Sequence, residues 1–421
     1  MIKYVVKGGK RLYGTTRVQG AKNSVLPILA ATIISGRQSV IINCPKIVDV
    51  HMAVEILKFL GCEVYWQGND LVIDSAHIEN THIPNSLMTK MRSSVIFLGA
   101  ILARMNKATC STPGGCEIGA RPVNLHLKAF RQVGVTVTEK NGYIHCDATG
   151  IKSGKIHLDF PSVGATENMI LAAVNCPGKT IITNAAREPE IVDLQDFLNA
   201  MGAKVTGAGS DKIVIEGVKT FVPVSWEIIP DRIVAATVLF AVAGTGGDVT
   251  LQNVNIHDID SILAVLEEMG TQIMAGKDSV RICSEEKLNA IDSVKTMPFP
   301  GFPTDAQPQM MAALTHANGS SIIEERIFEN RFKTAGQLVK MGANITLKDQ
   351  IAVIRGVDKL TGCRVDAPDL RGGAALVIAG LMANGTTEIG NIHFVERGYD
   401  GIEKIFASLG GDIEKVEYLE K

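Results

Sequence analysis

The chain has 421 residues, of which 46% are hydrophobic and 20% are charged, so it can fill large hydrophobic cores and build two or more domains. Its formal net charge of −2 argues against a basic nucleic-acid-binding surface and against an acidic tail. The N-terminal residues carry no apolar signal segment, and the apolar runs reach about ten residues, half of the roughly 20 that span a membrane. We therefore expect a cytoplasmic protein.

The predicted elements follow the same order six times along the chain. Each repeat contains an apolar helix, a short strand, an amphipathic helix, a step from a hydrophobic residue to glycine, and a strand pair, which gives a βαβαββ unit. Successive step glycines are 68 to 73 residues apart. They are Gly61, Gly134, Gly202, Gly270, Gly342 and Gly410. Six copies at nearly constant spacing predict a repeat architecture.

The two helices of a repeat differ in their hydrophobic pattern. The first is apolar on all sides, which is typical of a helix buried on all sides. The second is amphipathic: in 192–202, Leu194, Phe197, Leu198 and Met201 form one stripe, with charged residues opposite. The glycine after this helix is a natural C′ residue. The apolar helices are expected within 26–34, 93–103, 167–174, 232–244, 308–319 and 372–385.

The strand pairs carry hairpin signals. Residues 135–147 alternate around Asn141-Gly142, and residues 63–74 and 344–356 show a similar pattern. We expect the sheets outside and the apolar helices inside.

The six repeats fit either one ring or two lobes of three. Near the midpoint, Pro223, Pro230 and the Asp231–Arg232 pair suggest a crossover between lobes. We expect an α/β protein and, if the repeats form two lobes, one lobe at 22–229 and the other at 1–21 plus 230–421. The chain would then cross between the lobes twice, residues 1–21 would pair with the second lobe, and a ligand site is expected in the cleft between them.

Cations precede three of the apolar helices. Lys22 and Asn23 stand before the first, Arg92 before the second and Arg371 before the sixth. Helix N-termini attract anions, so these residues suggest a shared anion site; the alternative is that Asn23 or Ser24 caps the first helix. Arg331 and Arg397 add further positive charge.

Two other helix fronts are polar. Asp305 precedes the fifth apolar helix and is either its N-cap or a carboxylate base. Residues 161–168 either cap the third helix or offer backbone N–H groups to a phosphate. No Walker loop and no dinucleotide-binding glycine pattern stands between a strand and a helix, which argues against an ATPase and a nicotinamide enzyme.

The second repeat contains an inserted, glycine-rich loop. Cys116 lies there among Gly114, Gly115 and Gly119, with Arg121 five residues further on. The other seven cysteines are scattered without zinc spacing, so we expect them to be reduced and packed as small apolar residues, and we expect no metal or cofactor. A flexible loop with a thiol suggests a moving lid over a ligand.

The whole chain resembles the enolpyruvyl transferases, and most closely their UDP-N-acetylglucosamine 1-carboxyvinyltransferase branch. The motifs that carry the resemblance are QGAKNSVLP (19–27), MRSSVIFLG (91–99), PGGCEIGARPVNLH (113–126), PSVGAT (161–166), NAAREPEI (184–191), FPTDAQ (302–307), IFENRF (327–332), DLRGG (369–373) and VERGY (395–399). The resemblance implies two inside-out α/β lobes and transfer of an enolpyruvyl group from phosphoenolpyruvate to a UDP-sugar hydroxyl, with release of phosphate.

The resemblance also implies roles for individual residues. Cys116 would be the acid that protonates phosphoenolpyruvate, and Asp305 a base in either the addition or the elimination step. Phosphoenolpyruvate would be bound by Lys22, Asn23, Arg121, Arg371 and Arg397. The UDP-sugar would be bound by Arg92, Arg121, Pro122, Val123, Asn124, Leu125, Ser162, Val163, Gly164, Asp305 and Ile327. Arg331 would support the site, and Phe160 departs from a lysine that some family members carry there.

Three other functions remain open at this stage. Transfer to shikimate 3-phosphate uses the same fold, although that relative lacks the cysteine loop. A ring-like scaffold on DNA would need a basic inner surface, and a sugar-nucleotide-binding module without turnover would leave Cys116 and Asp305 unexplained. We expect small-molecule substrates, no nucleic acid or membrane partner, and a monomer.

Overall fold

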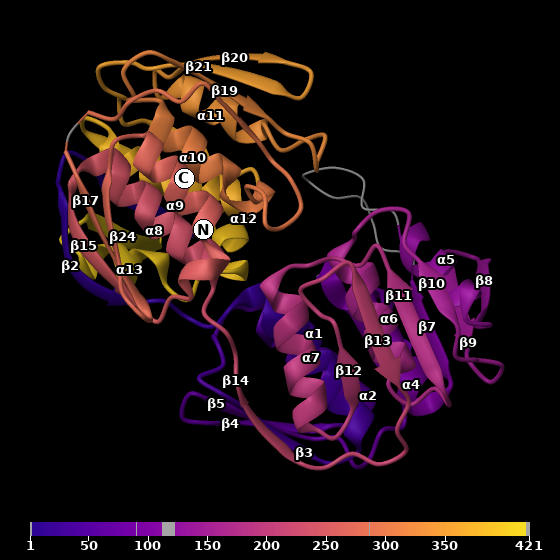
Figure 1. Cartoon of the computed structure of the whole chain (residues 1–421). Helices are drawn as coiled ribbons and strands as arrows, with labels where there is room; N and C mark the ends of the chain where they lie inside the picture. The colour runs from indigo at the N-terminus through magenta and orange to yellow at the C-terminus, as the bar shows by residue number, and fades with distance from the viewer. Residues whose placement is uncertain (1, 90, 112–122, 286, 418–421) are drawn as a thin grey trace. The chain divides into compact units, whose positions relative to one another are not determined.

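The computed structural model describes residues 2–89, 91–111, 123–285 and 287–417 (Figure 1). The chain divides into two compact units. Of the described residues, those from Gly20 to Ile229 form the central unit, and those up to Gln19 together with those from Pro230 onward form the terminal unit. The main chain thus passes from one unit to the other at Gln19–Gly20 and at Ile229–Pro230.

The described part of the central unit contains three four-stranded sheets. In each, the first strand runs parallel to the second, and the other neighbours are antiparallel. Their strand orders are β14 (Val224–Glu227), β3 (Gln38–Ile42), β5 (Asp70–Asp74), β4 (Glu63–Gln67); β6 (His82–Ile83), β7 (Lys107–Ser111), β9 (Tyr143–Asp147), β8 (Thr136–Lys140); and β10 (Lys155–His157), β11 (Lys179–Thr183), β13 (Lys212–Glu216), β12 (Lys204–Thr206).

The described part of the terminal unit has three sheets of the same pattern. Their strand orders are β2 (Leu12–Arg17), β15 (Gly247–Gln252), β17 (Ser279–Ser284), β16 (Gln272–Ala275); β18 (Ser293–Lys295), β19 (Ser320–Glu324), β21 (Ile351–Arg355), β20 (Asn344–Lys348); and β22 (Arg364–Asp366), β23 (Thr386–Gly390), β1 (Ile2–Lys7), β24 (Asp412–Glu417). The sheets of β6–β9, β10–β13 and β18–β21 are each one contiguous βαβαββ repeat, which confirms the unit expected from the spacing, and each of the other three described sheets takes one strand from elsewhere in the chain.

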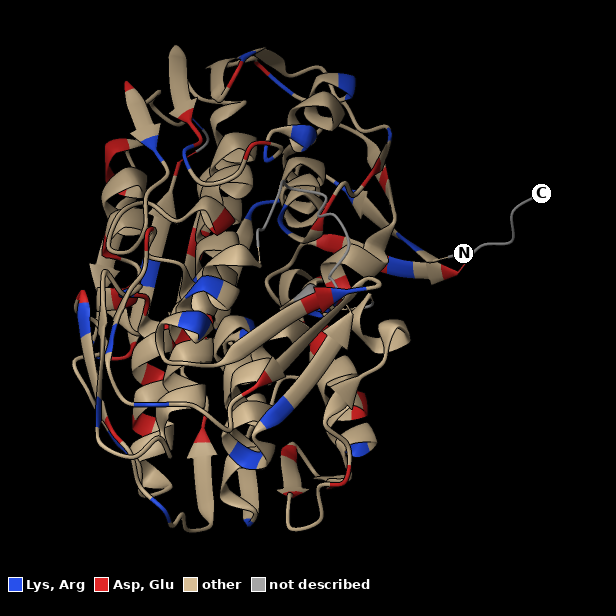
Figure 2. Cartoon of the chain, turned by 90° about the vertical axis from the view of Figure 1, so that its right-hand side faces the viewer, with Lys and Arg blue, Asp and Glu red and all other residues tan. Residues whose placement is uncertain are grey.

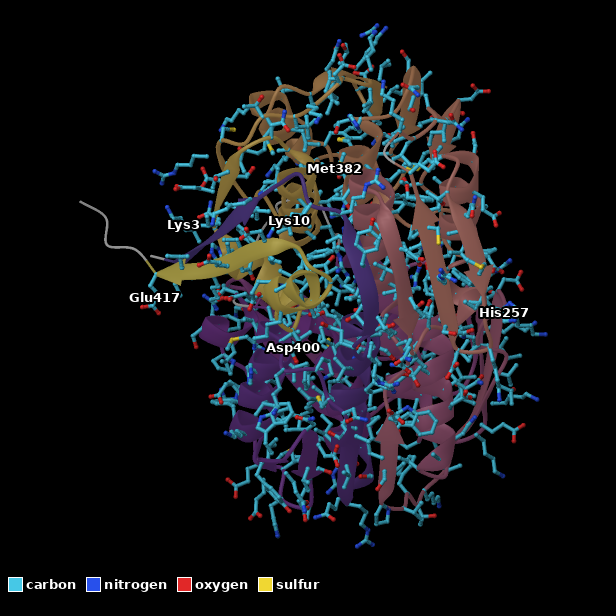
Figure 3. All side chains as sticks on the ribbon, turned by 90° about the vertical axis from the view of Figure 1, so that its left-hand side faces the viewer. Lys3, Lys10, His257, Met382, Asp400 and Glu417 are labelled. Atoms are coloured by element: carbon cyan, nitrogen blue, oxygen red, sulfur yellow. The ribbon has the colours of Figure 1, made fainter. Side chains whose placement is uncertain are left out.

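Two sheets of the terminal unit take strands from the N-terminus. β1 lies between β23 and β24, with Ile2 opposite Glu417, and β2 runs parallel to β15. Figure 3 shows β1, which carries Lys3, beside the yellow β24 that ends at Glu417. The expected pairing of the N-terminal residues with the second half of the chain is therefore present, and β14 in turn completes the first sheet of the central unit.

The apolar helices form the interior of each unit. In the central unit α4 contacts both α1 and α6, and in the terminal unit α8, α10 and α12 contact one another. Every residue of α10 is buried. This confirms the prediction of inner helices and outer sheets. The inner helices are α1 (Lys22–Ser35), α4 (Phe97–Met105), α6 (Val163–Ala173), α8 (Arg232–Thr245), α10 (Gln307–Leu314) and α12 (Leu370–Met382).

The amphipathic helices bridge neighbouring sheets. In the central unit each amphipathic helix contacts the strand that follows it in the chain and also the first strand of the next sheet. The second contact is with β6 for α2, with β10 for α5 and with β14 for α7, so the unit closes on itself. The glycines after all six have φ between 85° and 112°, as expected for C′ glycines. These helices are α2 (Val48–Leu60), α5 (Asn124–Gln132), α7 (Pro189–Ala200), α9 (Asp260–Glu268), α11 (Lys333–Lys340) and α13 (Ile402–Ser408).

Short helical turns complete the described elements. They are α3 (Asn85–Met88) and the 3₁₀ helices η1 (Arg92–Ile96), η2 (Ile256–Asp258), η3 (Thr304–Ala306) and η4 (Ile392–Arg397). The expected hairpin at Asn141-Gly142 joins β8 to β9, with both turn residues at positive φ. Basic and acidic positions are interspersed in both units (Figure 2). None of the described helices is both long and apolar enough to cross a membrane.

Candidate active site

Asp305 lies between two buried arginines of the terminal unit. It belongs to η3, in front of α10. Its Oδ1 accepts a hydrogen bond from Nη2 of Arg331 at 2.8 Å, and its Oδ2 accepts from Nε and Nη2 of Arg371 at 3.2 and 3.1 Å. Both arginine side chains are 2% exposed, whereas that of Asp305 is 25% exposed. The structure thus brings three predicted site residues together, and rejects Asp305 as the N-cap of α10, because that position is held by Ala306.

Asp369 and Tyr399 hold Arg371 in place. Asp369 caps α12, because its Oδ1 accepts from the backbone N–H groups of Arg371 and Gly372 at 3.0 Å, and this oxygen lies 3.7 Å from Nη1 of Arg331. The Arg371 guanidinium lies over the Tyr399 ring, 5.5 Å from its centroid. The role of Asp369 was not predicted from the sequence, although an aspartate directly before an apolar helix is an N-cap signal.

One nitrogen of Arg371 is ready to bind an anion. Burial lowers the pKa of this guanidinium, but Tyr399, Asp305 and Asp231 outweigh burial and raise the pKa, so it stays charged. Its Nη1 is buried and has no hydrogen-bond partner among the described residues. A buried donor without an acceptor costs about 1–3 kcal/mol, which a bound phosphate or carboxylate would recover.

Lys22 is the first residue of α1 in the central unit. Its Nζ lies 2.7 Å from Oδ2 of Asp49, in the first turn of α2, and both side chains are largely buried. A cation is disfavoured at a helix N-terminus, and Asp49 compensates for that position. The N-cap of α1 is Ala21, which makes no side-chain capping bond, so the capping role considered for Asn23 or Ser24 is wrong. Asn23 is half-buried.

Ser24 instead donates a hydrogen bond to Asp193. Asp193 also accepts from Nε1 of Trp226 at 2.9 Å and from the Ile229 N–H at 3.4 Å. Burial raises the pKa of Asp193, although these three hydrogen bonds oppose it. The sequence pattern placed Asp193 on the exposed side of its helix; this was wrong, because three partners from distant segments satisfy the carboxyl group in the interior.

The segments expected to bind the nucleotide sugar begin α5 and α6. Ser162 is the N-cap of α6, and its Oγ accepts from Ala165 N at 3.4 Å, which confirms the capping interpretation. Val163 and Gly164 form the first turn of α6. Val123 stands at the N-cap of α5, and Asn124 and Leu125 begin that helix.

Asn168 and His126 connect these two helix starts. The Asn168 Nδ2 donates to Val95 O at 2.9 Å and to Nδ1 of His126 at 2.8 Å, and its Oδ1 accepts from Gly99 N at 2.7 Å. Burial lowers the pKa of His126 to about 4, so the imidazole is neutral near pH 7 and Nδ1 can accept. A Cβ on Gly164 would lie 3.2 Å from Cε1 of His126, so the two helix starts are closely packed. Neither residue was predicted from the sequence, although a polar asparagine within an apolar helix was an available signal.

The other predicted residues are placed as follows. Arg397 ends η4, and the Ile327 N–H donates to Oε1 of Glu325 at 2.8 Å. Phe160 is 45% exposed. Cys116, Arg121 and Pro122 lie outside the described residues, as does the side chain of Arg92, so the loop closure expected around Cys116 stays a prediction.

No group of three histidine, cysteine or acidic side chains is arranged for a metal within the described ranges. The seven described cysteines are free thiols. Burial raises the pKa of Cys62, Cys110 and Cys146 to about 12, which keeps these thiols protonated at neutral pH.

Comparison with known proteins places the chain in a family. A protein from Caldanaerobacter subterraneus subsp. tengcongensis named UDP-N-acetylglucosamine 1-carboxyvinyltransferase 2 is 50% identical over 416 residues, covering 99% of this chain and all of that protein. The chain belongs to the UDP-N-acetylglucosamine 1-carboxyvinyltransferase family. UDP-N-acetylglucosamine 1-carboxyvinyltransferase 1 of Carboxydothermus hydrogenoformans is 48% identical over the whole of both chains.

The wider family and the fold agree with this result. Residues 6–406 match the family described as EPSP synthase (3-phosphoshikimate 1-carboxyvinyltransferase). The enolpyruvyl transferase NikO from Streptomyces tendae is similar in structure, with a TM-score of 0.88, 24% identity and 99% of each chain covered. EPSP synthase from Acinetobacter baumannii gives a TM-score of 0.76 at 19% identity, over 99% of this chain and all of that one. The enolpyruvyl transferase fold implied by the resemblance is confirmed.

Proposed function

We propose that the protein transfers the enolpyruvyl group of phosphoenolpyruvate to the 3′-hydroxyl of UDP-N-acetylglucosamine and releases phosphate, as the first committed step of peptidoglycan synthesis. The names of its relatives support this activity. The structural observation that carries it is the buried Nη1 of Arg371, which has no hydrogen-bond partner in the described part of the chain, together with the partly exposed carboxylate of Asp305. An anion-binding cation thus adjoins a group able to accept a proton.

Phosphoenolpyruvate brings a phosphate and a carboxylate, and the proposed cations match both groups. Arg371 offers Nη1, and Lys22 offers an ammonium group at a helix N-terminus. Asn23, Arg121 and Arg397 complete the proposed set. Asp49 pairs with the Lys22 ammonium group at 2.7 Å and orients it.

The nucleotide sugar is assigned to the starts of α5 and α6. Backbone N–H groups in the first turn of a helix favour anions, and here two such turns are packed together through His126 and Gly164. The proposed residues are Arg92, Arg121, Pro122, Val123, Asn124, Leu125, Ser162, Val163, Gly164, Asp305 and Ile327.

The proposed chemistry is an addition followed by an elimination. In the addition, the sugar oxygen bonds to C2 of phosphoenolpyruvate while C3 receives a proton, which turns the methylene into a methyl group. In the elimination, a methyl proton leaves and phosphate departs from C2, so that the vinyl double bond forms again. Cys116 is proposed as the donor of the first proton, since a thiol with a reference pKa of about 8.5 is mostly protonated at pH 7.

Asp305 is proposed as the base. Two guanidinium groups hold both of its oxygens, which fixes its direction, and its side chain is 25% exposed. It would accept the hydroxyl proton during addition or the methyl proton during elimination. Arg331 supports this position through Thr304 O and the carboxylate.

Phosphate release with two acceptors and a control without acceptor tests the proposal. The protein is incubated with phosphoenolpyruvate and UDP-N-acetylglucosamine, shikimate 3-phosphate, or no acceptor. We expect stoichiometric phosphate only with the UDP-sugar. Release only with shikimate 3-phosphate would assign the related activity, and UDP-sugar binding without release from phosphoenolpyruvate would leave a binding module.

Cys116 is tested by alkylation. An electrophilic phosphonate epoxide such as fosfomycin is expected to label Cys116, most rapidly with the UDP-sugar present, because the raised pKa values of Cys62, Cys110 and Cys146 make those thiols poor competitors. Peptide mass spectrometry identifies the site. Label on another cysteine, or full activity of Cys116→Ser, would remove Cys116 from the mechanism.

We also propose that the protein acts as a cytoplasmic monomer.

A further inference from the structure

Glu325 is a fully buried carboxyl group near the site, and no role considered so far uses it. It directly follows β19 and is 0% exposed. Its Oε1 accepts hydrogen bonds from Thr296 Oγ1 at 2.8 Å, Ile327 N at 2.8 Å and Phe328 N at 3.1 Å. Its Oε2 accepts from Thr304 Oγ1 at 3.0 Å. A buried carboxylate is tolerated when it is hydrogen-bonded in this way.

The hydrogen bond at Oε2 of Glu325 affects Asp305 through Thr304, the residue before it in the chain. Thr304 precedes Asp305 in η3, and its carbonyl oxygen accepts from Nε and Nη2 of Arg331 at 3.2 and 3.1 Å. Glu325 therefore holds the side chain of Thr304 while Arg331 holds its backbone. Losing the first bond frees the turn that directs the Asp305 carboxylate.

The Oε1 bonds act on the loop after β19. The N–H groups of Ile327 and Phe328 both point to this oxygen, and Thr296 links it to the Arg326 N–H, which donates to Thr296 Oγ1 at 2.8 Å. One carboxyl group thus connects the turn that carries the proposed base with the loop that carries the proposed sugar contact, Ile327.

We infer that Glu325 is a positioning residue, which fixes Asp305 and Ile327 relative to each other through its two oxygens. This inference rests on the proposed function. Hydrogen bonds to an ionised acceptor are about twice as strong as neutral ones, so four of them define a geometry firmly. Misplacing a reacting group by about 1 Å lowers catalysis by roughly 100-fold.

The two oxygens can be tested separately. Thr304→Val removes only the Oε2 bond, and we expect kcat to fall by about tenfold or more while the KM for UDP-N-acetylglucosamine stays within about twofold. Thr304→Ser restores the hydroxyl and should restore kcat. Glu325→Leu removes both connections, so we expect kcat to fall and the UDP-sugar KM to rise together.

Thr315→Val is the matched control. Thr315 lies in the same unit and is fully buried, whereas Thr304 is half-buried, and the Oγ1 of Thr315 donates one bond of 2.7 Å to Ala312 O, away from Glu325. Its kcat and KM should match those of the native chain. A general loss of stability would lower the melting temperature of both valine variants, whereas a positioning role separates them by kcat.

Hydrogen exchange supplies a readout that needs no substrate. Glu325→Leu should speed exchange of the Ile327 and Phe328 amides, and Thr304→Val should speed exchange in η3 only. Two results would overturn the positioning role. One is a kcat of Thr304→Val equal to that of an active native chain, and the other is unchanged amide hydrogen exchange in both variants. Absence of turnover in the native chain would instead reject the proposed function, and the exchange data would still decide whether Glu325 fixes the two segments.

Discussion

The two units hold their site segments by different chemistry. In the central unit, the starts of α5 and α6 are tied by a neutral amide and a neutral imidazole, Asn168 and His126. In the terminal unit, Asp305 is tied by two buried guanidinium groups, those of Arg331 and Arg371. The hydrogen bond between Asn168 and His126 joins neutral groups, so added salt should not weaken it, but it is lost when the imidazole gains a proton. The charged connection is strong while complete, and breaking it leaves uncompensated buried charge.

The difference suits what each segment is proposed to do. A helix start that binds a nucleotide with its N–H groups needs a fixed backbone and no competing charge. A base needs a fixed carboxylate, and cations near developing negative charge assist the reaction. The following substitutions and conditions break one side of this comparison at a time.

The largest effect is expected for Asp305→Ala. It removes the proposed base, so kcat for phosphate release should fall by about 10²- to 10⁴-fold. It also removes the carboxylate that is hydrogen-bonded to both Arg331 and Arg371, and urea unfolding should show a loss of about 3 kcal/mol. Asp248→Ala is the matched control, because Asp248 pairs with Arg281 through two hydrogen bonds on the surface of the same unit. A loss of stability equal in both variants would contradict the account.

Arg371→Lys keeps the charge and removes the planar fork. We expect the KM for phosphoenolpyruvate to rise by roughly 10- to 100-fold, the equivalent of one charged hydrogen bond, with little change in the UDP-sugar KM. Steady-state kinetics with each substrate varied in turn gives both values. If the UDP-sugar KM rose alone, Arg371 would belong to the other substrate.

Asn168→Leu tests the neutral connection. It leaves the Gly99 N–H, the Val95 carbonyl and His126 without their buried partner, so we expect a loss of about 3 kcal/mol in unfolding and a higher UDP-sugar KM. Asn199→Leu provides the comparison, since Asn199 also makes two backbone hydrogen bonds but is exposed. Equal losses in the two variants would show that burial of Asn168 adds nothing.

Acid should weaken the central unit through His126. Its pKa of about 4 in the folded protein lies below the unfolded value of about 6.5, so the unfolded chain binds the proton first. The stability is complete above about pH 6.5 and is lost as the pH falls toward 4, with about 2 kcal/mol lost between pH 7 and pH 5. Urea unfolding at both pH values measures the loss, and His126→Gln should reduce it. An unchanged loss in that variant would assign the acid sensitivity to other groups.

The repeat was predictable because its signals are local. Helix periodicity, the Asn141-Gly142 turn and the C′ glycines each act within a few residues, and all appear as expected. The partners of buried polar groups were not predictable in the same way. Asn168 bonds His126, 42 residues away, and Asp193 bonds Ser24, 169 residues away, so only the fold reveals why these side chains lie inside.

Glu325 shows the same limit. The motif IFENRF drew attention to Ile327 and Arg331. Glu325, two residues before this motif, acquires its role from Thr296 and Thr304, which reach it from the segment after β18 and from η3. In contrast, Asp305, Arg331 and Arg371 were expected from their motifs, and the structure adds that they touch.

The central chemical claim is that C3 of phosphoenolpyruvate is protonated during transfer and loses a proton again. The most direct test is to run the reaction with UDP-N-acetylglucosamine in deuterated water and to examine the enolpyruvyl product by proton NMR and mass spectrometry. The account predicts deuterium in the vinyl group of the product, because a solvent-derived deuteron enters the intermediate methyl group and is partly retained. A product formed at the full rate with no deuterium in its vinyl group would contradict it.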